Sequence, residues 1–561
     1  MKFLSNSKQK QSGFSLVELN VAIVLFLLSA VAIIGILTFC TAGAKKSTEL
    51  AQCVQLAQRK MAETICLGAD DIKDAAVPAA FPSPFERYAY TVRKIKPTDT
   101  RLSDFVEVCV TVKSPTGTKT ELVTLKNSKE APSTWAKLFS KKNARNADVK
   151  KIIQTKDGGY LVIISFNYPG KSSRPWILKL NPDGSVAWEK EYDVGRGFHN
   201  LTSVCENEDG SFTAIGTSDK FGGDRECGWI IKLNPDGSTA WEKLYGTRGA
   251  TTANYLNTIQ RTSDGGYIAS GDICYDYYSS YKKTRGWQDG WVVKFRSDGS
   301  IQWQKAYGGS ETDMIHSARQ TSDGGYIMTI YDSSSGAAWT SRLCVMKLNS
   351  DGSVSWQKKY EGVDASSSQI LQTDNGDYTV MGQARDTNNK ICPWIAKLTS
   401  NGNIKWQKLY GRETYGNYKR IFSLEPTSDG SYIAAGGFQI ATKVGSYFRS
   451  NREAWILKID SNGYPVWQKA LGSPLVAEGY GGWDEGKFAQ QISDGGYIMG
   501  GPYDDQVARK TEGWVVKFDS KGNTTLNPGA VMIDTTTPVY NASISPRNNN
   551  LTVINTNATS R

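Results

Sequence analysis

Hydrophobic positions divide the sequence into regions with different patterns. A mostly apolar run from Phe14 to Phe39 is 26 residues long. As a helix it would span about 39 Å, enough to cross a bilayer. Beyond it, apolar residues recur three or four positions apart, as expected for one face of a helix, at Leu50, Val54, Ala57, Met61 and Ile65. The pattern therefore predicts one long helix that ends near Gly68.

Residues 86–126 change to the alternation that is typical of β-strands. The segments "RYAYTVRKI", "DFVEVCVTVK" and "TELVTLK" predict three short strands, and "SPTG" predicts the turn between the last two. A long helix followed by a small antiparallel sheet indicates an α+β domain.

The rest of the chain is a repeat array. A tight-turn signature, mostly Asp-Gly, recurs seven times, at Asp157, Asp209, Asp264, Asp323, Asn375, Asp429 and Asp494. A second signature, an aromatic residue or Cys followed by alternating apolar residues and Lys, recurs at Trp176, Trp229, Trp291, Cys344, Trp394, Trp455 and Trp514, with spacings of 50 to 62 residues. These spacings are typical of the four-stranded blades of a β-propeller.

Each repeat predicts four strands, called here A to D. Asp-Gly or Asn-Gly at the A–B and C–D connections fits hairpin turns. In strand D a Trp and a Tyr stand four apart, as in Trp241 and Tyr245, so both lie on one face of the strand and can pack against the next blade.

The last repeat lacks its strand D, because "NTTLNPG" follows the strand that contains Trp514. The missing pattern occurs ahead of the first repeat, as "WAKLF" from Trp135 to Phe139. We therefore predict a seven-bladed ring closed by pairing of residues 134–139 with the strand near Trp514, which removes open sheet edges. The Asn- and Thr-rich tail after 530 is either a flexible end or an added strand.

One acidic residue, Glu18, stands inside the apolar run. An ionisable group in such a segment is costly and is a functional candidate. A plain membrane anchor, a cleaved secretory signal ending near Ala44 and a lipoprotein signal at Cys40 are alternatives. A signal h-region is about 7–15 residues long, however, and the bulky Phe39 does not suit lipoprotein processing. None of the alternatives explains Glu18.

The residues Gly13-Phe14-Ser15-Leu16-Val17-Glu18, after a short basic leader, resemble the signal of type IV pilins and type II secretion pseudopilins. The resemblance implies cleavage after Gly13 by a prepilin peptidase and methylation of the new terminus at Phe14. It also implies that Glu18 pairs with the terminal amine of a neighbouring subunit during filament assembly, a buried opposite-charge pair that favours one register. Asn20 departs from a clean apolar run but leaves the processing residues intact.

The resemblance extends to the order of helix and sheet, which is similar to that of minor pilins and minor pseudopilins. We therefore expect a leader at 1–13, a transmembrane and filament helix at 14–68 and a pilin-like β domain at 69–132. A seven-bladed propeller at 133–530 and a tail at 531–561 follow. The expected fold is thus an α+β pilin-like domain fused to an all-β propeller.

Strand direction places the tight turns on one face of the propeller and the longer B–C and D–A connections on the other, here called the variable face. Aromatic and Arg residues in its long loops are the types that dominate recognition hot spots. The ligand-binding candidates are Tyr275, Tyr277, Tyr278, Tyr281, Arg285 and Trp287 in the third blade, Tyr447, Phe448 and Arg449 in the sixth, and Tyr480 and Trp483 in the following D–A loop. Packing of these rings onto the blades is the alternative.

Catalysis is not indicated. The "DGSVAW" pattern is loosely similar to the tryptophan-docking repeats of quinone-dependent dehydrogenases, but that similarity concerns blade packing, and no cofactor is expected. The sequence contains two His, His199 and His316, near D–A connections, where a solvated or locally bonded ring is the simpler interpretation. Calcium loops and CxxC pairs are missing from the sequence, so no metal is expected.

Composition indicates which partners and which cellular compartment to expect. The net charge of +11 is modest for 561 residues and forms no dense basic block, so no nucleic acid is expected as a partner. The nine cysteines fit an exported protein, with Cys205–Cys227 and Cys66–Cys109 as disulfide candidates and Cys40 as the unpaired one.

Together these features predict a minor pilin or pseudopilin rather than an enzyme. It would reside in the inner membrane, with its C-terminal part outside the cytoplasm, before it joins other pilins through its helix. It would then present the propeller at the cell surface to a glycan or protein. A propeller of about 400 residues has a radius of gyration of about 21 Å, whereas packed helices lie about 8–10 Å apart, so few subunits of a filament can carry one. A membrane-anchored propeller enzyme and an inner-membrane sensor or scaffold are the alternatives.

Overall fold

The computed structural model describes residues 53, 54, 56, 57, 60, 75–80, 87–95, 105–115, 117–127, 134–144, 146–168, 173–192, 199–219, 226–246, 253–274, 287–333, 342–411, 419–444, 447–472, 482–505, 510–525, 531–534, 539–541, 546–548, 552–555 and 559–560. The chain divides into two compact units, Met1–Pro132 and Ser133–Arg561. The leader and the apolar run that contains Glu18 lie outside the described residues. No helix within the described ranges is long and apolar enough to cross a membrane.

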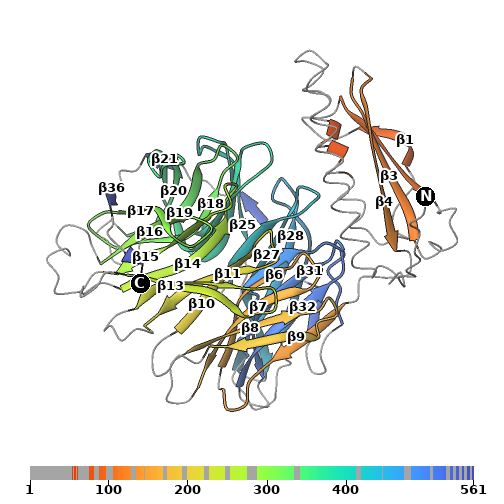
Figure 1. Ribbon diagram of the computed structural model, residues 1–561. Helices are drawn as coiled ribbons and strands as arrows, with labels where there is room; N and C mark the ends of the chain where they lie inside the picture. The colour runs from red at the N-terminus through yellow and green to blue at the C-terminus, as the bar shows by residue number, and fades with distance from the viewer. Residues whose placement is uncertain are drawn as a thin grey trace, which may run out of the picture. The chain divides into compact units, whose positions relative to one another are not determined.

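The first unit contains an antiparallel sheet of four strands in the order β1-β2-β3-β4 (Figure 1). The strands are β1 (Ala75–Ala80), β2 (Ala89–Ile95), β3 (Phe105–Lys113) and β4 (Lys119–Asn127). Three of them match the predicted segments, and the Ser114 carbonyl accepts the Gly117 N–H at 3.1 Å in the predicted turn. The sequence pattern missed β1, because "AAVPAA" contains Pro78. Proline is tolerated in this edge strand, whose register with β2 is interrupted between Ala75 and Ala79.

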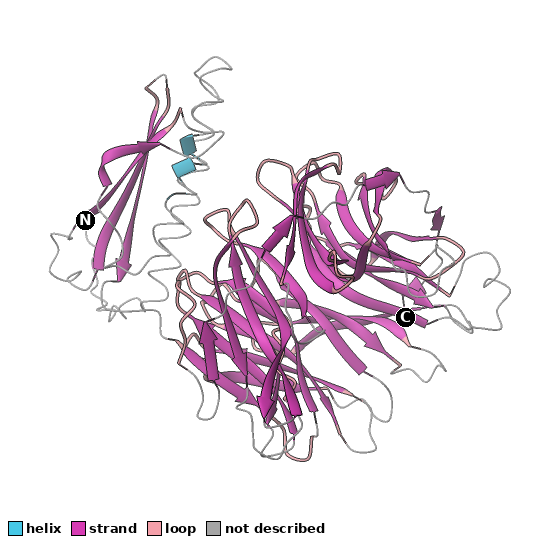
Figure 2. Ribbon diagram, turned by 180° about the vertical axis from the view of Figure 1, so that it is seen from behind, coloured by secondary structure: helices cyan, strands magenta, loops and turns pink. Residues whose placement is uncertain are grey.

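A helical stretch packs on this sheet (Figure 2). Cys53, Leu56 and Ala57 are buried in one cluster with apolar residues of β2 and β3, including Val92 and Val108. Of the residues predicted to face the sheet, Ala57 is buried as expected. Val54 is only half-buried, and its neighbour Cys53 is fully buried instead. Leu50, Met61 and Ile65 lie outside the described residues.

The second unit is built from four-stranded antiparallel blades. Blade 1 contains β6 (Asn146–Gln154), β7 (Tyr160–Asn167), β8 (Arg174–Leu180) and β9 (Val186–Glu191); blade 2 contains β10 (His199–Glu206), β11 (Phe212–Ser218), β12 (Cys227–Leu233) and β13 (Thr239–Gly246); blade 3 contains β14 (Ala253–Arg261), β15 (Tyr267–Cys274), β16 (Gln288–Phe295) and β17 (Ile301–Gly308); blade 4 contains β18 (Asp313–Gln320), β19 (Tyr326–Asp332), β20 (Arg342–Leu348) and β21 (Val354–Tyr360).

Three further blades complete the unit. Blade 5 contains β22 (Val363–Gln372), β23 (Tyr378–Arg385), β24 (Ile391–Leu398) and β25 (Ile404–Tyr410); blade 6 contains β26 (Lys419–Pro426), β27 (Tyr432–Val444), β28 (Tyr447–Ile459) and β29 (Pro465–Gly472); blade 7 contains β30 (Phe488–Gln491), β31 (Tyr497–Asp505), β32 (Lys510–Phe518) and, from the start of the unit, β5 (Trp135–Phe139). Each first strand contacts the first strand of the next blade, and β30 contacts β6, so the seven blades form a ring.

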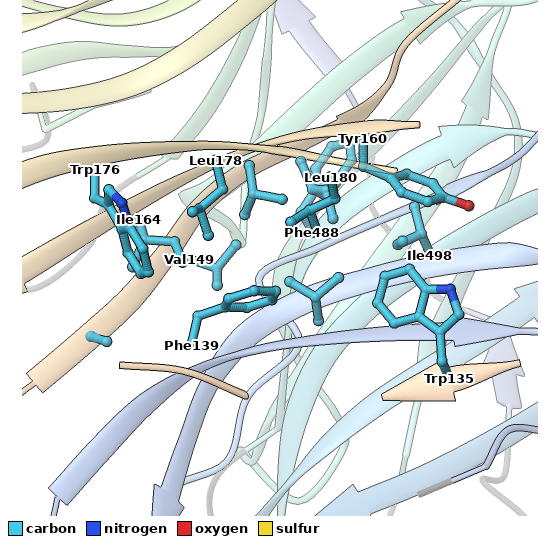
Figure 3. Packing of buried hydrophobic residues seen from close by; sticks show 14 of the residues in the cluster. Trp135, Phe139, Val149, Tyr160, Ile164, Trp176, Leu178, Leu180, Phe488 and Ile498 are labelled. Atoms are coloured by element: carbon cyan, nitrogen blue, oxygen red, sulfur yellow. The ribbon is translucent and has the colours of Figure 1, made fainter. Parts of the chain in front are cut away.

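The ring closes as the sequence predicts. Strand β5 pairs antiparallel with β32, from Phe139 opposite Gly513 to Trp135 opposite Lys517. Figure 3 shows Trp135 and Phe139 within one buried cluster that also contains Tyr160 and Trp176 of blade 1 and Ile498 of blade 7. The first and last repeats therefore share one core, so unfolding of the junction must expose apolar surface from both.

Tryptophan residues of the outer strands pack against the neighbouring blade. The Trp135 indole N–H donates to the Pro182 carbonyl at 3.1 Å, and the ring lies over Gly184 in the C–D turn of blade 1. A Cβ at Gly184 would come within 2.9 Å of that ring, and its φ of 78° also favours glycine. The same contact recurs at every other junction, with Trp188, Trp241, Trp303, Trp356, Trp406 and Trp467 over Gly237, Gly299, Gly352, Gly402, Gly463 and Gly522.

The predicted role of the strand D tyrosines is confirmed by their hydroxyl groups. Tyr307 donates to the Gly352 carbonyl and Tyr360 to the Gly402 carbonyl, each at 2.7 Å. The Trp and the Tyr of one outer strand thus hold the same turn of the following blade.

The C-terminal tail adds strands to the outer edges of five blades. We call residues 531–560 the strap. Strap strands β33 (Val531–Asp534), β34 (Val539–Asn541), β35 (Pro546–Asn548), β36 (Thr552–Asn555) and β37 (Thr559–Ser560) pair antiparallel with β29, β25, β21, β17 and β13 in turn. The strap therefore runs around the ring from blade 6 to blade 2, opposite to the order of the blades in the sequence. Of the two expectations for the tail, the added strand is what the structure shows.

Candidate ligand-binding face

The variable face consists of the ends of the blades where strands B and D finish and strands A and C begin. The opposite face consists of short turns such as Thr155–Gly159, in which the Gly158 N–H donates to the Thr155 carbonyl at 2.9 Å. Strand β5 begins on that turn face, because Trp135 lies opposite Lys517 near the end of β32. The chain therefore joins the propeller on the face opposite to the variable loops.

Trp483 is the most exposed large hydrophobic side chain among the described residues, with 62% of its surface accessible. It lies in the connection from blade 6 to blade 7 and forms a parallel bridge with Arg452 at the edge of β28. The Arg452 N–H donates to the Gly482 carbonyl at 2.9 Å, and the Asp484 N–H donates to the Arg452 carbonyl at 3.0 Å. The backbone that carries the exposed indole is thus part of the sheet.

A side-chain contact also fixes the position of the Trp483 ring. The Arg452 guanidinium lies 4.3 Å from the ring centroid, a cation–π contact, and its Nη1 is 3.6 Å from Glu485 Oε1. The backbone N–H of Trp483 donates to Asp504 Oδ2 at 3.3 Å. An aromatic side chain that is exposed yet fixed in position loses little entropy on binding, which is the property of a recognition anchor.

A hairpin arm stands beside this anchor, where the sequence predicted a loop. Strands β27 and β28 are 13 residues each and remain paired as far as Val444 opposite Tyr447. The predicted sixth-blade loop is therefore wrong, because its residues continue the β ladder beyond the blade. The signal was present as Gly-Ser between two β-prone segments, which favours a two-residue hairpin turn. The candidates Tyr447, Phe448 and Arg449 lie on this arm, at the start of β28, and the structure describes their backbone.

The third-blade candidate that the structure describes is Trp287, which is 42% exposed immediately before β16. Its neighbour Gln288 forms a parallel bridge with Thr312 of the next connection. Trp287 and Trp483 belong to connections of different blades and are not part of one described cluster. Tyr275, Tyr277, Tyr278, Tyr281, Arg285 and Tyr480 lie outside the described residues.

Buried charged groups lie at the strand ends of blades 3 and 4. Asp289, Asp313 and Asp332 are fully buried, and Lys359 Nζ forms an ion pair with Asp332 Oδ2 at 2.5 Å. Burial, together with the negative charges of Asp332 and Asp289, raises the pKa of Asp313 to about 7 even though its Oδ2 accepts the Gly309 N–H at 2.7 Å.

Two further carboxyl groups share this behaviour. Burial raises the pKa of Asp272 to about 7 although Ile315 and Asn257 donate to it. Burial and the charge of Asp484 raise the pKa of Glu453 to about 7. The rim beneath the variable face therefore holds carboxyl groups that are neutral in mild acid and become charged near neutral pH.

His199 lies in a Ser-His-Asp arrangement that does not suit nucleophilic catalysis. Its Nδ1 is 2.7 Å from Ser218 Oγ, and its Nε2 is 3.7 Å from Asp219 Oδ1. Ser218 is completely buried and His199 is 1% exposed, so a substrate cannot reach the hydroxyl. His316 lies in β18 of a different blade, and burial lowers its pKa to about 4. Of the two interpretations of the His residues, solvated or locally bonded, His199 shows the local bonding.

The predicted disulfides are wrong. Cys205 and Cys109 are free thiols. Cys205 lies on β10 and Cys227 on β12, with β11 between them, so the two side chains cannot reach each other. Cys66 and Cys40 lie outside the described residues. Among the residues that the structure describes, no group of three His, Cys, Asp or Glu could hold a metal ion.

Comparisons with known proteins agree with the N-terminal motif. Residues 8–38 match the prokaryotic N-terminal methylation motif, a range that includes the second part of the predicted leader and the candidate residues Gly13, Phe14 and Glu18. The chain therefore carries a prepilin-type signal ahead of a propeller-like all-β body. No curated protein matches the sequence.

Solved structures with a similar arrangement differ widely in sequence. A puromycin hydrolase is 11% identical with a TM-score of 0.34 over 79% of this chain, which spans 60% of that protein's length. The WD40 domain of SCAP from fission yeast is 8% identical with a TM-score of 0.33, over 69% of this chain and 98% of that domain. A rhamnogalacturonan lyase is 13% identical with a TM-score of 0.30, over 79% of each chain.

Proposed function

We propose that the chain is a minor pilin or pseudopilin that presents its propeller as a binding module. In this proposal a prepilin peptidase cleaves after Gly13 and methylates Phe14. The helix then leaves the inner membrane for a filament, where Glu18 pairs with the terminal amine of a neighbouring pilin. The observation that supports this best is the methylation motif at residues 8–38, because it combines the processing residues with the otherwise costly Glu18.

The architecture of the propeller supports a presenting role. Strand β5 enters on the turn face, and the exposed Trp483 and Trp287 lie on the variable face. A module that is tethered through one face and offers aromatic residues on the other can bind a surface ligand without obstruction by its own tether. We propose that this ligand is a glycan or a protein, and that Trp483 is its principal contact.

A non-enzymatic role is part of the proposal. The one Ser-His-Asp arrangement within the described part of the chain has a buried hydroxyl, which supports binding rather than hydrolysis. A purified propeller-bearing chain that turned over a glycan or an ester at its variable face would contradict this part.

The assembly step is tested by Glu18→Leu, with Glu18→Asp as the matched control that keeps the charge. If the pairing role is correct, the Leu variant is cleaved and methylated but remains in the inner membrane, and the Asp variant reaches the surface in part. Surface labelling of intact cells measures both. Surface display of the Leu variant at the level of the unaltered chain would refute the assembly role.

A further inference from the structure

The strap follows the ring in steps of seven residues. The strap residues opposite the end of each outer strand are Met532, Val539, Pro546, Val553 and Ser560, which lie opposite Leu471, Tyr410, Tyr360, Tyr307 and Tyr245. One blade thus corresponds to one heptad of the tail. This period was not evident in the sequence because the tail is dominated by Asn, Thr and Ser.

A second position of the heptad is equally regular. Two residues after the first four of these strap positions stand Asp534, Asn541, Asn548 and Asn555. Each of them lies opposite a lysine of the outer strand, namely Lys469, Lys408, Lys358 and Lys305. An acidic or amide residue recurs where the outer strand supplies a lysine. The match between tail and ring is therefore one of chemistry as well as length.

The acceptor pattern extends beyond the five blades that the strap covers. Every outer strand has a Trp, a Lys two places later and an aromatic or Leu residue four places later. Blade 1 has Trp188, Lys190 and Tyr192, and blade 7 has Trp135, Lys137 and Phe139. Within the described part of the chain, neither β9 nor β5 carries a strap strand. Strands β9 and β5 therefore have the same residue pattern as the five outer strands that pair with the strap.

These two strands form one continuous gap. The strap covers blades 6, 5, 4, 3 and 2 in that order, and blades 1 and 7 follow next around the ring. Two heptads running in the same direction would fill the gap without a change of register.

The backbone of β9 leaves donors at its outer edge. The Tyr192 N–H donates inward to the Pro175 carbonyl at 3.1 Å. Because backbone groups alternate sides along an antiparallel strand, the N–H groups of Lys190 and Trp188 also face β8, and those of Glu189 and Glu191 face outward. Outward N–H groups of an edge strand are a template for pairing with another chain.

We propose that the gap on blades 1 and 7 accepts the last two strap units, residues 552–560, of a second copy of this chain. The heptad identifies the occupant, because the segment whose units already pair with five similar acceptor strands is the strap itself. Strand β37 pairs through two residues, Tyr245 with Ser560 and Gly246 with Thr559, so the end of the strap is the part most easily released. Transfer of these two units leaves blades 3 and 2 of one copy uncovered as it covers blades 1 and 7 of the other, so the number of paired strap units does not change and the exchange costs little once two copies meet.

The register of the exchange gives a direct test. Continuing the pattern places Asn555 of one copy opposite Lys190 of the other. Two differently tagged full-length copies, one with Lys190→Cys and one with Asn555→Cys, are therefore expected to form a mixed disulfide dimer on oxidation. Excess synthetic peptide of residues 552–561 should abolish the dimer by occupying the gap.

Controls separate this contact from other association. Adding Glu189→Pro to the Lys190→Cys copy removes an outward donor but no bond to β8, and is expected to weaken peptide binding about tenfold. Glu189→Ala keeps the donor and should have no effect. A cross-link yield no higher than that of the Asn555→Cys copy with an unaltered copy would overturn the proposal. So would a yield that is indifferent to peptide and to Glu189→Pro.

Discussion

The closing strand β5 makes a testable contribution to the stability of the ring. Trp135 is 7% exposed, and its ring centroid lies 5.7 Å from that of Tyr160 in blade 1. Its indole N–H donates to the Pro182 carbonyl at 3.1 Å. Replacing a buried Trp by Ala typically costs about 3–5 kcal/mol, and the lost hydrogen bond about 1 kcal/mol. We therefore expect Trp135→Ala to lower the free energy of unfolding by about 4 kcal/mol.

The matched control is Trp188→Ala. Trp188 makes the same contact with the next blade, including an N–H bond to the Pro235 carbonyl at 3.1 Å, but it is covalently continuous with its own blade. Trp135, in contrast, lies in a strand that reaches blade 7 from the other end of the repeat array. Loss of Trp135 should therefore release β5, whereas loss of Trp188 should lower stability without release of a strand.

Urea unfolding followed by circular dichroism measures the stability of both variants, and hydrogen exchange of residues 135–139 measures the release of β5. The expected result for Trp135→Ala is faster exchange of β5 under conditions where the other blades stay protected. A loss of stability below about 1 kcal/mol, with β5 as well protected as in Trp188→Ala, would refute the closure argument.

Three other predictions concern the turn glycine, the buried carboxyl groups and the exposed anchor. Gly184→Ala should destabilise more than Gly265→Ala in urea unfolding, because both glycines have positive φ but only the first would clash with an indole; equal losses would argue against the contact. Asp313 has a folded pKa of about 7, above the unfolded value near 4, so its contribution to stability is full below about pH 4 and is lost as pH rises to about 7, by up to about 1.4 kcal/mol per unit. Asp313→Asn should therefore flatten the decline of thermal stability over that range, and an unchanged slope would exclude Asp313 as its source. Trp483→Ala should reduce attachment of cells with little change in melting temperature, whereas Tyr464→Ala, 54% exposed in a C–D turn of the opposite face, should leave attachment intact; equal attachment by both variants would move the site elsewhere.

Sequence repeats predicted the ring well because each blade has its own turn and packing residues. The tight-turn signature and the aromatic-apolar-Lys signature each recur once per blade, so their count gave seven blades. The displaced "WAKLF" segment gave the closure through Trp135. Side chains that contact only the neighbouring repeat leave a pattern that one sequence can reveal.

Other features depend on contacts between distant segments and were not predicted. The pairing of the strap requires the outer strands to be in place, and its heptad is masked by polar residues. The sixth-blade arm differs from the predicted loop, although the Gly-Ser turn between two β-prone segments is present in the sequence. Cysteine spacing suggests a Cys205–Cys227 disulfide that strand order excludes, because β11 separates the two residues. The sequence does not distinguish exposure of Trp483 from packing, because the position of its ring depends on a contact with Arg452 of another strand.

The central claim is that this propeller is carried by a processed pilin-type subunit. The most direct test is mass spectrometry of the mature N-terminus in cells with and without a prepilin peptidase. The proposal predicts a chain that begins at N-methylated Phe14 when the peptidase is present, and an uncleaved chain that retains Gly13 when it is missing. A mature chain that still begins at Met1, or one cut after Ala44, in cells that contain the peptidase would contradict it.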